Sequence, residues 1–352
     1  MNSLGFDKSP GDTRVVVAMS GGVDSSTAAA LMAEQGYEVI GVTLQLYDHG
    51  QALGRKGACC AGQDIYDARR VADRLSIPHY VLDYESRFKE HVIEDFADTY
   101  LAGETPIPCV RCNQTVKFRD LLGKARELGA DALVTGHYAR RLEGRRGPEL
   151  HRALDDAKDQ SYFLHAVSGD RIARTLFPVG ELEKPEVRRI AEQQGFVTHD
   201  KKDSTGICFI GERKFKDFLS RYLPAQPGII ETAEGEEIGK HEGLMYHTLG
   251  QRKGLHIGGL AKFGDDPWYV VDKDVARNVL IVGQGADHPR LYSKGLVAKQ
   301  LHWVDRKTIT EPVRAVVKTR YRQADIPCTI TPTQDDTIEV MFDEPQKAVT
   351  PG

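Results

Sequence analysis

Ser20-Gly21-Gly22-Val23-Asp24-Ser25-Ser26 separates a strand pattern from a helix pattern and is the stretch that decides the fold. Residues 14–19 before it are mostly apolar and include three β-branched valines, which predicts a buried strand. Residues 27–35 after it are strong helix formers, and Gly36 follows them as a typical helix end. Because free backbone N–H groups gather where a helix begins, we expect this loop to bind phosphate rather than to be a simple tight turn.

The loop lacks the lysine that follows the glycines in the Gly-x-x-x-x-Gly-Lys-Ser/Thr phosphate loop. Its glycines allow close backbone approach to an anion, and its serines add hydroxyl donors. The string resembles the pyrophosphate (PP) loop of the ATP pyrophosphatases. That resemblance implies that ATP is split between its α and β phosphates, that a substrate oxygen is adenylated, and that a nucleophile then displaces AMP. It does not define the substrate.

Composition is typical of an ordinary soluble protein with two or three domains: 352 residues, 40% hydrophobic and 28% charged. The formal net charge of −4 argues against indiscriminate nucleic-acid binding. The sequence contains no run of membrane-spanning length, and residues 1–8 lack the apolar core of a signal peptide, so we expect a cytoplasmic protein with no membrane partner. In that reducing compartment, the six cysteines are expected to be free thiols, metal ligands or catalytic groups.

Strand and helix patterns alternate through the first half of the chain. Strands are predicted at 14–19, 37–44, 79–83 and 132–135, and helices at 27–35, 64–75, 87–100 and 114–128. This alternation predicts an α/β fold with a parallel sheet and with ligands at the carboxyl ends of its strands. The pattern turns helical over 169–223, Pro224-Ala225-Gln226-Pro227-Gly228 reads as a linker, and short β-type runs follow it. We therefore predict a nucleotide-binding domain at 1–166, a small mainly helical domain at 167–223 and a β-barrel-like domain at 224–352.

A Cys-x-x-Cys motif, Cys109-Val110-Arg111-Cys112, precedes the helix predicted from Gln114, with Asn113 as its N-cap. A helix N-terminus, Arg111 and Lys117 should together lower the pKa of these thiols. Cys208 lies in a second turn, near lysines. Half a zinc site, a redox pair and coincidence are the alternatives, and zinc is disfavoured because the adjacent pair Cys59-Cys60 suits tetrahedral coordination poorly.

Several segments together resemble the tRNA-specific 2-thiouridylases, which replace the C2 oxygen of the anticodon wobble uridine by sulfur. They span nearly the whole chain in the family's order: Ser20–Ser26, Thr105–Asn113, Thr135–Ala139, Lys158–Phe163, Asp203–Gly211, Gly250–Gly254 and Thr319–Arg322. The resemblance implies an adenine-nucleotide α-hydrolase-like first domain. It also makes two other classes less favoured, namely another ATP pyrophosphatase ligase and a non-catalytic RNA- or metal-binding protein.

The resemblance also implies roles residue by residue. Cys112 matches the nucleophile and Cys208 the persulfide carrier, while Cys109 stands where many relatives have Asp. The ATP-contacting positions are Ala18, Met19, Ser20, Gly21, Gly22, Val23, Asp24, Ser25, Leu44 and Gly136. The positions near the target base or the tRNA are Ile107, Pro108, Cys109, His137, Lys158, Asp159, Gln160, Arg320 and Tyr321.

Two sulfur routes remain open. In one, a Cys208 persulfide supplies sulfur and Cys112 attacks it to release sulfide or to close a disulfide. In the other, Cys109, Cys112 and Cys208 hold a 4Fe–4S cluster. Either route uses ATP with Mg²⁺, for which Asp24 is a candidate ligand, and takes sulfur from a relay protein or a cysteine desulfurase. The expected substrates are the tRNAs for Lys, Glu and Gln, recognised at the anticodon stem-loop by a monomer.

A basic strand is predicted at 313–322, with Arg314, Lys318, Arg320 and Arg322 on one face. We expect that face to bind RNA phosphates, with help from the basic groups at 213–216 and 251–253. Cys328 is expected in the core, and Cys59-Cys60 to be ordinary thiols. Relatives usually continue beyond the position of Gly352, which leads us to expect an incomplete last domain.

Overall fold

The computed structural model describes residues 5–47, 60–203, 206–210, 218–220, 222–258, 262–305, 309–334 and 336–352. The chain forms two compact units. The first unit comprises Met1–Ile93, Pro108–Phe209 and His302–Thr308, and the second comprises Glu94–Ile107, Ile210–Leu301 and Ile309–Gly352. Within the described ranges, no helix is long and apolar enough to cross a bilayer.

The first unit is built on a parallel sheet, as the strand–helix alternation predicts. Its strand order is β3-β2-β1-β4-β7. The strands are β1 (Arg14–Ala18), β2 (Glu38–Gln45), β3 (His79–Asp83), β4 (Ala132–Val134) and β7 (Thr175–Leu176). The chain adds β2 and β3 on one side of β1 and then β4 and β7 on the other, so the direction of winding reverses between β1 and β4. In sheets of this kind, ligands bind at such a reversal, outside the carboxyl ends of the strands.

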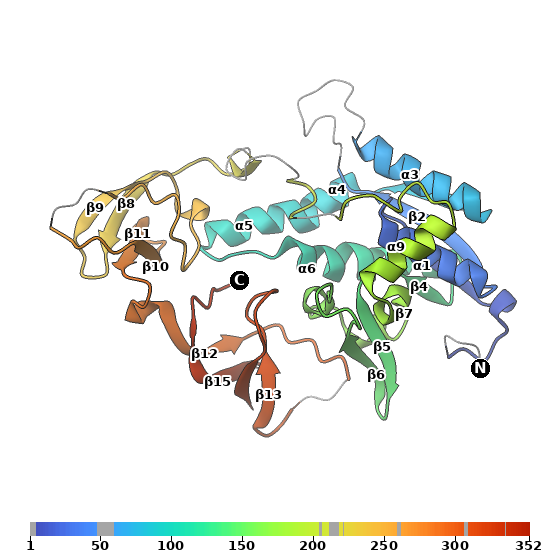
Figure 1. Ribbon diagram of the computed structural model, residues 1–352. Coiled ribbons are helices and arrows are strands. Elements are labelled where there is room, and N and C mark those ends of the chain that lie inside the picture. Colours follow the sequence, from blue (N-terminus) through green and yellow to red (C-terminus); the bar gives the residue numbers. More distant parts are fainter. Residues whose placement is uncertain are drawn as a thin grey trace. The chain divides into compact units, whose positions relative to one another are not determined.

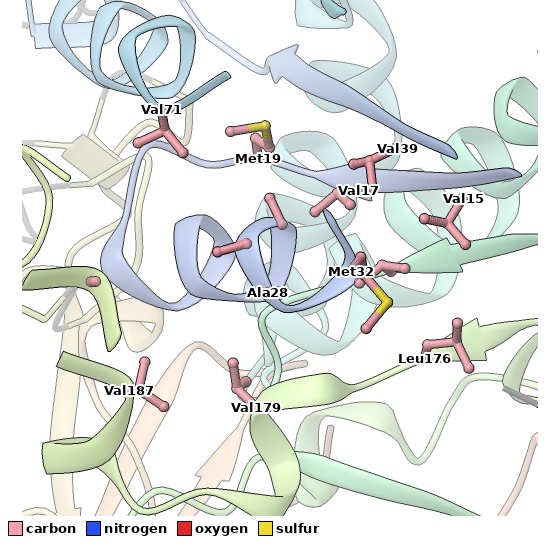
Figure 2. Close-up of a cluster of buried hydrophobic side chains, with 14 of the residues drawn as sticks. Val15, Val17, Met19, Ala28, Met32, Val39, Val71, Leu176, Val179 and Val187 are labelled. Carbon is pink, nitrogen blue, oxygen red and sulfur yellow. The ribbon is translucent and has the colours of Figure 1, made fainter. Parts of the chain in front are cut away.

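Helices cover both faces of this sheet (Figure 1). The first unit also contains η1 (Pro10–Asp12), α1 (Val23–Glu34), α3 (Cys60–Leu75), α4 (Glu85–Phe88), η4 (Ser161–Leu164), α8 (Gly169–Ile172), η5 (Pro178–Glu181), α9 (Lys184–Gln193) and the hairpin β5 (Ala139–Gly144)–β6 (Gly147–Arg152). Val15 and Val17 of β1 pack against Ala28 and Met32 of α1 on one face (Figure 2). Val16 packs into a separate cluster on the opposite face, because successive side chains of a strand alternate.

The helix that carries the cysteine pair begins earlier than predicted. It runs through α6 (Pro108–Cys112), η3 (Asn113–Leu121, a π-helix) and α7 (Leu122–Glu127). Asn113 is therefore not an N-cap: it is buried inside the helix and donates from Nδ2 to the Phe163 carbonyl at 3.0 Å. The physical reason is Pro108, whose fixed φ and missing N–H suit the first position of a helix.

The helical prediction for 169–223 is wrong at one place, since this stretch contains β7, the edge strand of the parallel sheet. A two-residue strand is too short to leave an alternating pattern, so its pairing with β4 supplies the signal that the sequence lacks.

The second unit contains two four-stranded sheets, which agrees with the all-β pattern predicted after residue 224. One sheet has the order β10-β11-β8-β9 and the other β12-β15-β14-β13. The elements are η2 (Lys89–Glu94, a π-helix that spans the boundary of the units), α5 (Asp95–Leu101), β8 (Gly228–Thr232), β9 (Glu237–His241), η6 (Leu244–Tyr246), β10 (Trp268–Asp274), β11 (Val279–Gln284), η7 (Pro289–Leu291), β12 (Tyr292–Ala298), β13 (Val313–Val317), β14 (Ile326–Pro332) and β15 (Ile338–Lys347). Cys328 is fully buried in β14, as expected of a core thiol.

Candidate active site

The glycine loop joins β1 to α1 at the reversal of the sheet. Gly21 has φ +72°, and a Cβ placed on it would lie 2.2 Å from the Asp64 carbonyl oxygen, so only glycine fits. Ser25 Oγ donates to the Gly22 carbonyl at 3.1 Å and accepts from the Ser20 N–H at 3.2 Å. These bonds set the shape of the loop at the start of α1, where the first backbone N–H groups have no partner within the helix.

A second loop, after β4, lies directly against the first. A Cβ on Gly136 would lie 2.7 Å from the Ser25 nitrogen, so the two backbones touch. The ten predicted ATP-contacting residues are therefore gathered at one edge of the sheet: Ala18 ends β1, Met19–Ser25 follow it, Leu44 is near the end of β2, and Gly136 follows β4.

Two lysines from distant parts of the chain supply the positive charge that the loop sequence lacks. Lys184 Nζ donates to Asp24 Oδ1 at 2.6 Å, and Tyr138 Oη donates to the same oxygen at 2.9 Å. Lys201 Nζ donates to the Gly21 carbonyl at 2.8 Å. Lys184 could not be predicted, because no pattern in the sequence relates the first residue of α9 to a loop 160 residues earlier.

Lys201 is held in place by two acidic residues on α3. It donates to Asp64 Oδ1 and to Asp67 Oδ2, each at 2.7 Å. Burial lowers the pKa of Lys201, but these hydrogen bonds outweigh that effect and raise it. The lysine therefore remains a cation beside the loop.

Asp203 connects this charged group to the segment that carries Cys208. Its carboxylate accepts from Lys158 at 2.8 Å and is paired with Lys184 at 2.9 Å and Arg188 at 2.7 Å. Desolvation raises the pKa of Asp203, but the hydrogen bonds from Lys158 and Lys184 outweigh it and hold the pKa at about 2. Lys184 thus bridges Asp24 of the loop and Asp203, five residues before Cys208.

Three predicted cysteines lie in the first unit, and all are free thiols. Cys112 is buried and Cys109 half-buried on α6, whereas the Cys208 residue keeps solvent-exposed surface in a turn. Tyr47 Oη donates to the Cys208 carbonyl at 3.0 Å, which fixes that turn. The Cys208 sulfur is close enough to the other two for their charges to interact.

The pKa values of these thiols are raised, which contradicts the lowering predicted from the sequence. Burial raises the pKa of Cys109 and Cys112. For Cys208, desolvation of the sulfur and then the other two thiols raise the pKa to about 12. Lys117 opposes the rise in all three. Arg111 is not among the charges that act on the three sulfurs, and its guanidinium donates to the His91 carbonyl and to Gln114 Oε1.

The described part of the chain contains no preformed metal site. Among the described residues, no three His, Cys, Asp or Glu side chains are grouped closely enough to hold a metal ion. The 4Fe–4S cluster on Cys109, Cys112 and Cys208 stays a prediction, and Asp24, the candidate Mg²⁺ ligand, already accepts two hydrogen bonds at Oδ1.

The predicted RNA-contacting residues of the first unit make internal bonds. Asp159 Oδ1 accepts from the Ala153 N–H at 3.1 Å, and Gln160 Oε1 accepts from the Tyr138 N–H at 2.9 Å. His137 lies 2.9 Å from Thr135 Oγ1, and burial holds its pKa well below the usual value, so the ring is neutral. Pro108 is buried.

The predicted basic strand is interrupted. β13 ends at Val317, so the alternation does not continue through Arg320 and Tyr321. Arg314 forms a bidentate pair with Asp343, and Arg320 Nη2 donates to the carbonyls of Leu249 and Ala348, at 3.3 and 2.8 Å. The expected face is thus partly neutralised. The basic group at 213–216, Cys59 and the side chain of Cys60 lie outside the described residues.

A parallel sheet with a glycine loop and two lysines at its reversal defines a nucleotide-binding α/β protein. Models described as the tRNA methyl transferase HUP domain, the tRNA methyl transferase PRC-barrel domain and the aminomethyltransferase beta-barrel domain match residues 13–212, 216–284 and 293–352. A protein of Vibrio cholerae named tRNA-specific 2-thiouridylase MnmA is 60% identical over 342 residues, covering 96% of this chain and 91% of its own. Proteins of the same name from Yersinia enterocolitica and Colwellia psychrerythraea are 56% and 55% identical, covering 96% and 98% of this chain and 90% and 92% of theirs. The chain belongs to the tRNA-specific 2-thiouridylase family.

Proposed function

We propose that this chain catalyses the ATP-dependent 2-thiolation of the wobble uridine of tRNA, with the tRNAs for Lys, Glu and Gln as substrates. One observation supports it above the others: a nucleotide-type loop and three free thiols lie in the same compact unit. Methyl transfer, which two of the matched models name, would need no such thiols.

The loop would bind ATP through the first backbone N–H groups of α1, with Lys184 and Lys201 offsetting phosphate charge. The uridine C2 oxygen attacks the α phosphorus, the bond to the β phosphate breaks, and pyrophosphate leaves. AMP on the C2 oxygen then becomes the leaving group. Mg²⁺ would enter with the ATP phosphates rather than in a preformed carboxylate site.

Sulfur would come from a persulfide on Cys208, loaded by a relay protein or a cysteine desulfurase. The outer sulfur attacks C2 and AMP departs, which leaves C2 joined to Cys208 through a disulfide. The Cys112 thiolate then attacks the Cys208 sulfur, so that a Cys112–Cys208 disulfide forms and 2-thiouridine is released. Alternatively, Cys112 attacks the persulfide first and releases sulfide, which displaces AMP. A two-electron reductant restores both thiols.

The tRNA would be held at its anticodon stem-loop, with the target base near Ile107, Pro108 and Cys109. Because His137 is neutral, its part in RNA contact would be as a hydrogen-bonding group rather than as a cation. The division at residues 166 and 223, the monomeric state and the cytoplasmic location also remain proposals.

The decisive experiment is an assay of AMP release and of thiouridine formation. Unmodified tRNA Lys is incubated with the chain, ATP, a cysteine desulfurase and cysteine, and the digested tRNA is analysed by mass spectrometry. We expect tRNA-dependent AMP release and 2-thiouridine from the wild type and from Cys328→Ala, whose thiol is buried in the second unit. Cys112→Ser and Cys208→Ser should form no 2-thiouridine. Full thiolation by Cys208→Ser would overturn the persulfide route.

A further inference from the structure

Lys117 is a half-buried cation for which the described part of the chain supplies no partner. It lies in η3, and it forms no hydrogen bond or ion pair in the described part of the chain. Among the described residues of this unit, the other lysines withdrawn from water are Lys158, Lys184 and Lys201, and each contacts a carboxylate. Because a buried or half-buried cation is costly unless it is paired, Lys117 is expected to have an anionic partner that is not a carboxylate.

The π-helical winding of η3 turns Lys117 toward the cysteine side of the helix. Cys112 is the last residue before η3, and Lys117 is five residues further on. In an α-helix, a residue five positions along is rotated by about 140° from the first. In a π-helix, whose hydrogen bonds join residues five apart, it returns to nearly the same face. The unusual winding therefore places an ammonium group and a buried thiol on one side.

The groups that face Lys117 agree with this placement. Its charge acts on Cys109 and Cys112 of the same helix, on Cys208 in its turn, and on His137 after β4. No carboxylate is among the groups whose charges act on the three thiols. The three thiols are therefore described groups that can form an anion within range of the Lys117 charge.

We propose that Lys117 is the positioning residue that stabilises the anionic sulfur of Cys112 for sulfur transfer, a role that rests on the proposed thiolation. When the Cys112 thiol loses its proton to water, the ammonium group offsets the negative charge on the sulfur. Burial opposes this ionisation, and the Arg111 guanidinium on the same helix is directed to the His91 carbonyl and to Gln114.

The test measures the thiol itself, without ATP or tRNA. The full chain is treated with methyl methanethiolsulfonate over a range of pH, and modification of Cys112 is quantified by peptide mass spectrometry. Lys117→Met should raise the midpoint of the pH profile by about one unit. At a fixed pH below both midpoints, Cys112 should therefore be modified roughly tenfold more slowly than in the wild type. Lys117→Arg should retain the wild-type profile, because it keeps the charge. Lys124→Met is the matched control: its lysine lies further along the same helix and pairs with Glu127.

Lys117→Gln repeats the test should the methionine variant fail to fold. Identical profiles for the wild type and the uncharged variants would overturn the proposal, as would an equal shift in Lys124→Met. The modification of Cys112 is measured without catalysis. If the wild-type chain formed no 2-thiouridine, that result would refute the proposed function and not this charge effect. In the thiolation assay, we expect the uncharged variants to be slow at pH 7 and to recover at higher pH.

Discussion

Gly136→Ala tests directly whether the contact between the two loops forms the nucleotide site. The added Cβ would lie 2.7 Å from the Ser25 nitrogen and 2.8 Å from the Asp24 carbonyl carbon, against an ordinary contact of at least 3.4 Å. One loop must therefore move by about 0.7 Å, the difference between 3.4 and 2.7 Å. Both obstructing atoms are backbone, so no flexible side chain can absorb the shift. Gly136 does not have a positive φ, and backbone strain therefore does not confuse the test.

The movement would pull the first N–H groups of α1 out of line with a bound phosphate. Loss of one charge-assisted hydrogen bond costs about 1.5–3 kcal/mol, which weakens ATP binding roughly 10- to 150-fold. Overpacking should also lower the free energy of unfolding by about 1–3 kcal/mol.

Isothermal titration with ATP and Mg²⁺ measures the affinity, and urea unfolding measures the stability. The matched control is Gly123→Ala in α7, where an added Cβ meets nothing within 4 Å and where alanine favours the helix. We expect the control to bind ATP normally and to be slightly more stable. Unchanged ATP affinity in Gly136→Ala, in a folded protein, would refute the assignment of ATP to this edge of the sheet.

Three further predictions follow from the charged groups around the loop. Lys184→Met removes the bridge between Asp24 and Asp203, so it should lower the free energy of unfolding by about 3 kcal/mol in urea titrations; Lys262→Met, whose exposed pair with Glu236 is in the second unit, should change it by less than about 1 kcal/mol. The pKa of Asp203 is depressed in the folded state, so its contribution of about 2 kcal/mol to the free energy of unfolding is present above pH 4 and is lost as the pH falls toward 2. Asp203→Asn should remove that part of the pH dependence. If the free energy of unfolding kept the same slope between pH 5 and pH 2, the result would contradict this prediction. Because the thiol pKa values are raised, the rate of thiolation should climb with pH above 7 in the wild type; a flat profile from pH 7 to 9 would mean that no cysteine ionisation limits the reaction.

Much of the local structure could be predicted from the sequence. Residues 14–19 are Arg14, three β-branched valines, Ala18 and Met19, a pattern that predicts a buried strand. The loop after them is equally recognisable from its glycines and serines. The strand predicted at 79–83 coincides with β3. These features depend on residues adjacent in sequence, where backbone preference and hydrophobic period act directly.

The local environment of the cysteines could not be predicted from the sequence. Their spacing predicts thiol chemistry, and proximity to basic residues suggests lowered pKa values. The structure shows that Arg111 is engaged by His91 and Gln114, and that burial dominates the ionisation of Cys112. Desolvation depends on what packs around a sulfur from other parts of the chain, and a linear motif does not contain that information.

The sequence alone therefore predicted the glycine loop, the parallel α/β fold and the Cys-x-x-Cys motif, because each depends on patterns among residues close together in the chain. Only the tertiary structure decided which cations serve the loop and how the Cys208 segment is joined to it. Lys184, Lys201 and Asp203 lie more than 150 residues from Gly21 and Asp24, and they meet these residues only because α9 and the residues after it pack against the α1 side of the sheet. Electrostatic interactions depend on distance in space, and folding brings these charges within hydrogen-bonding distance.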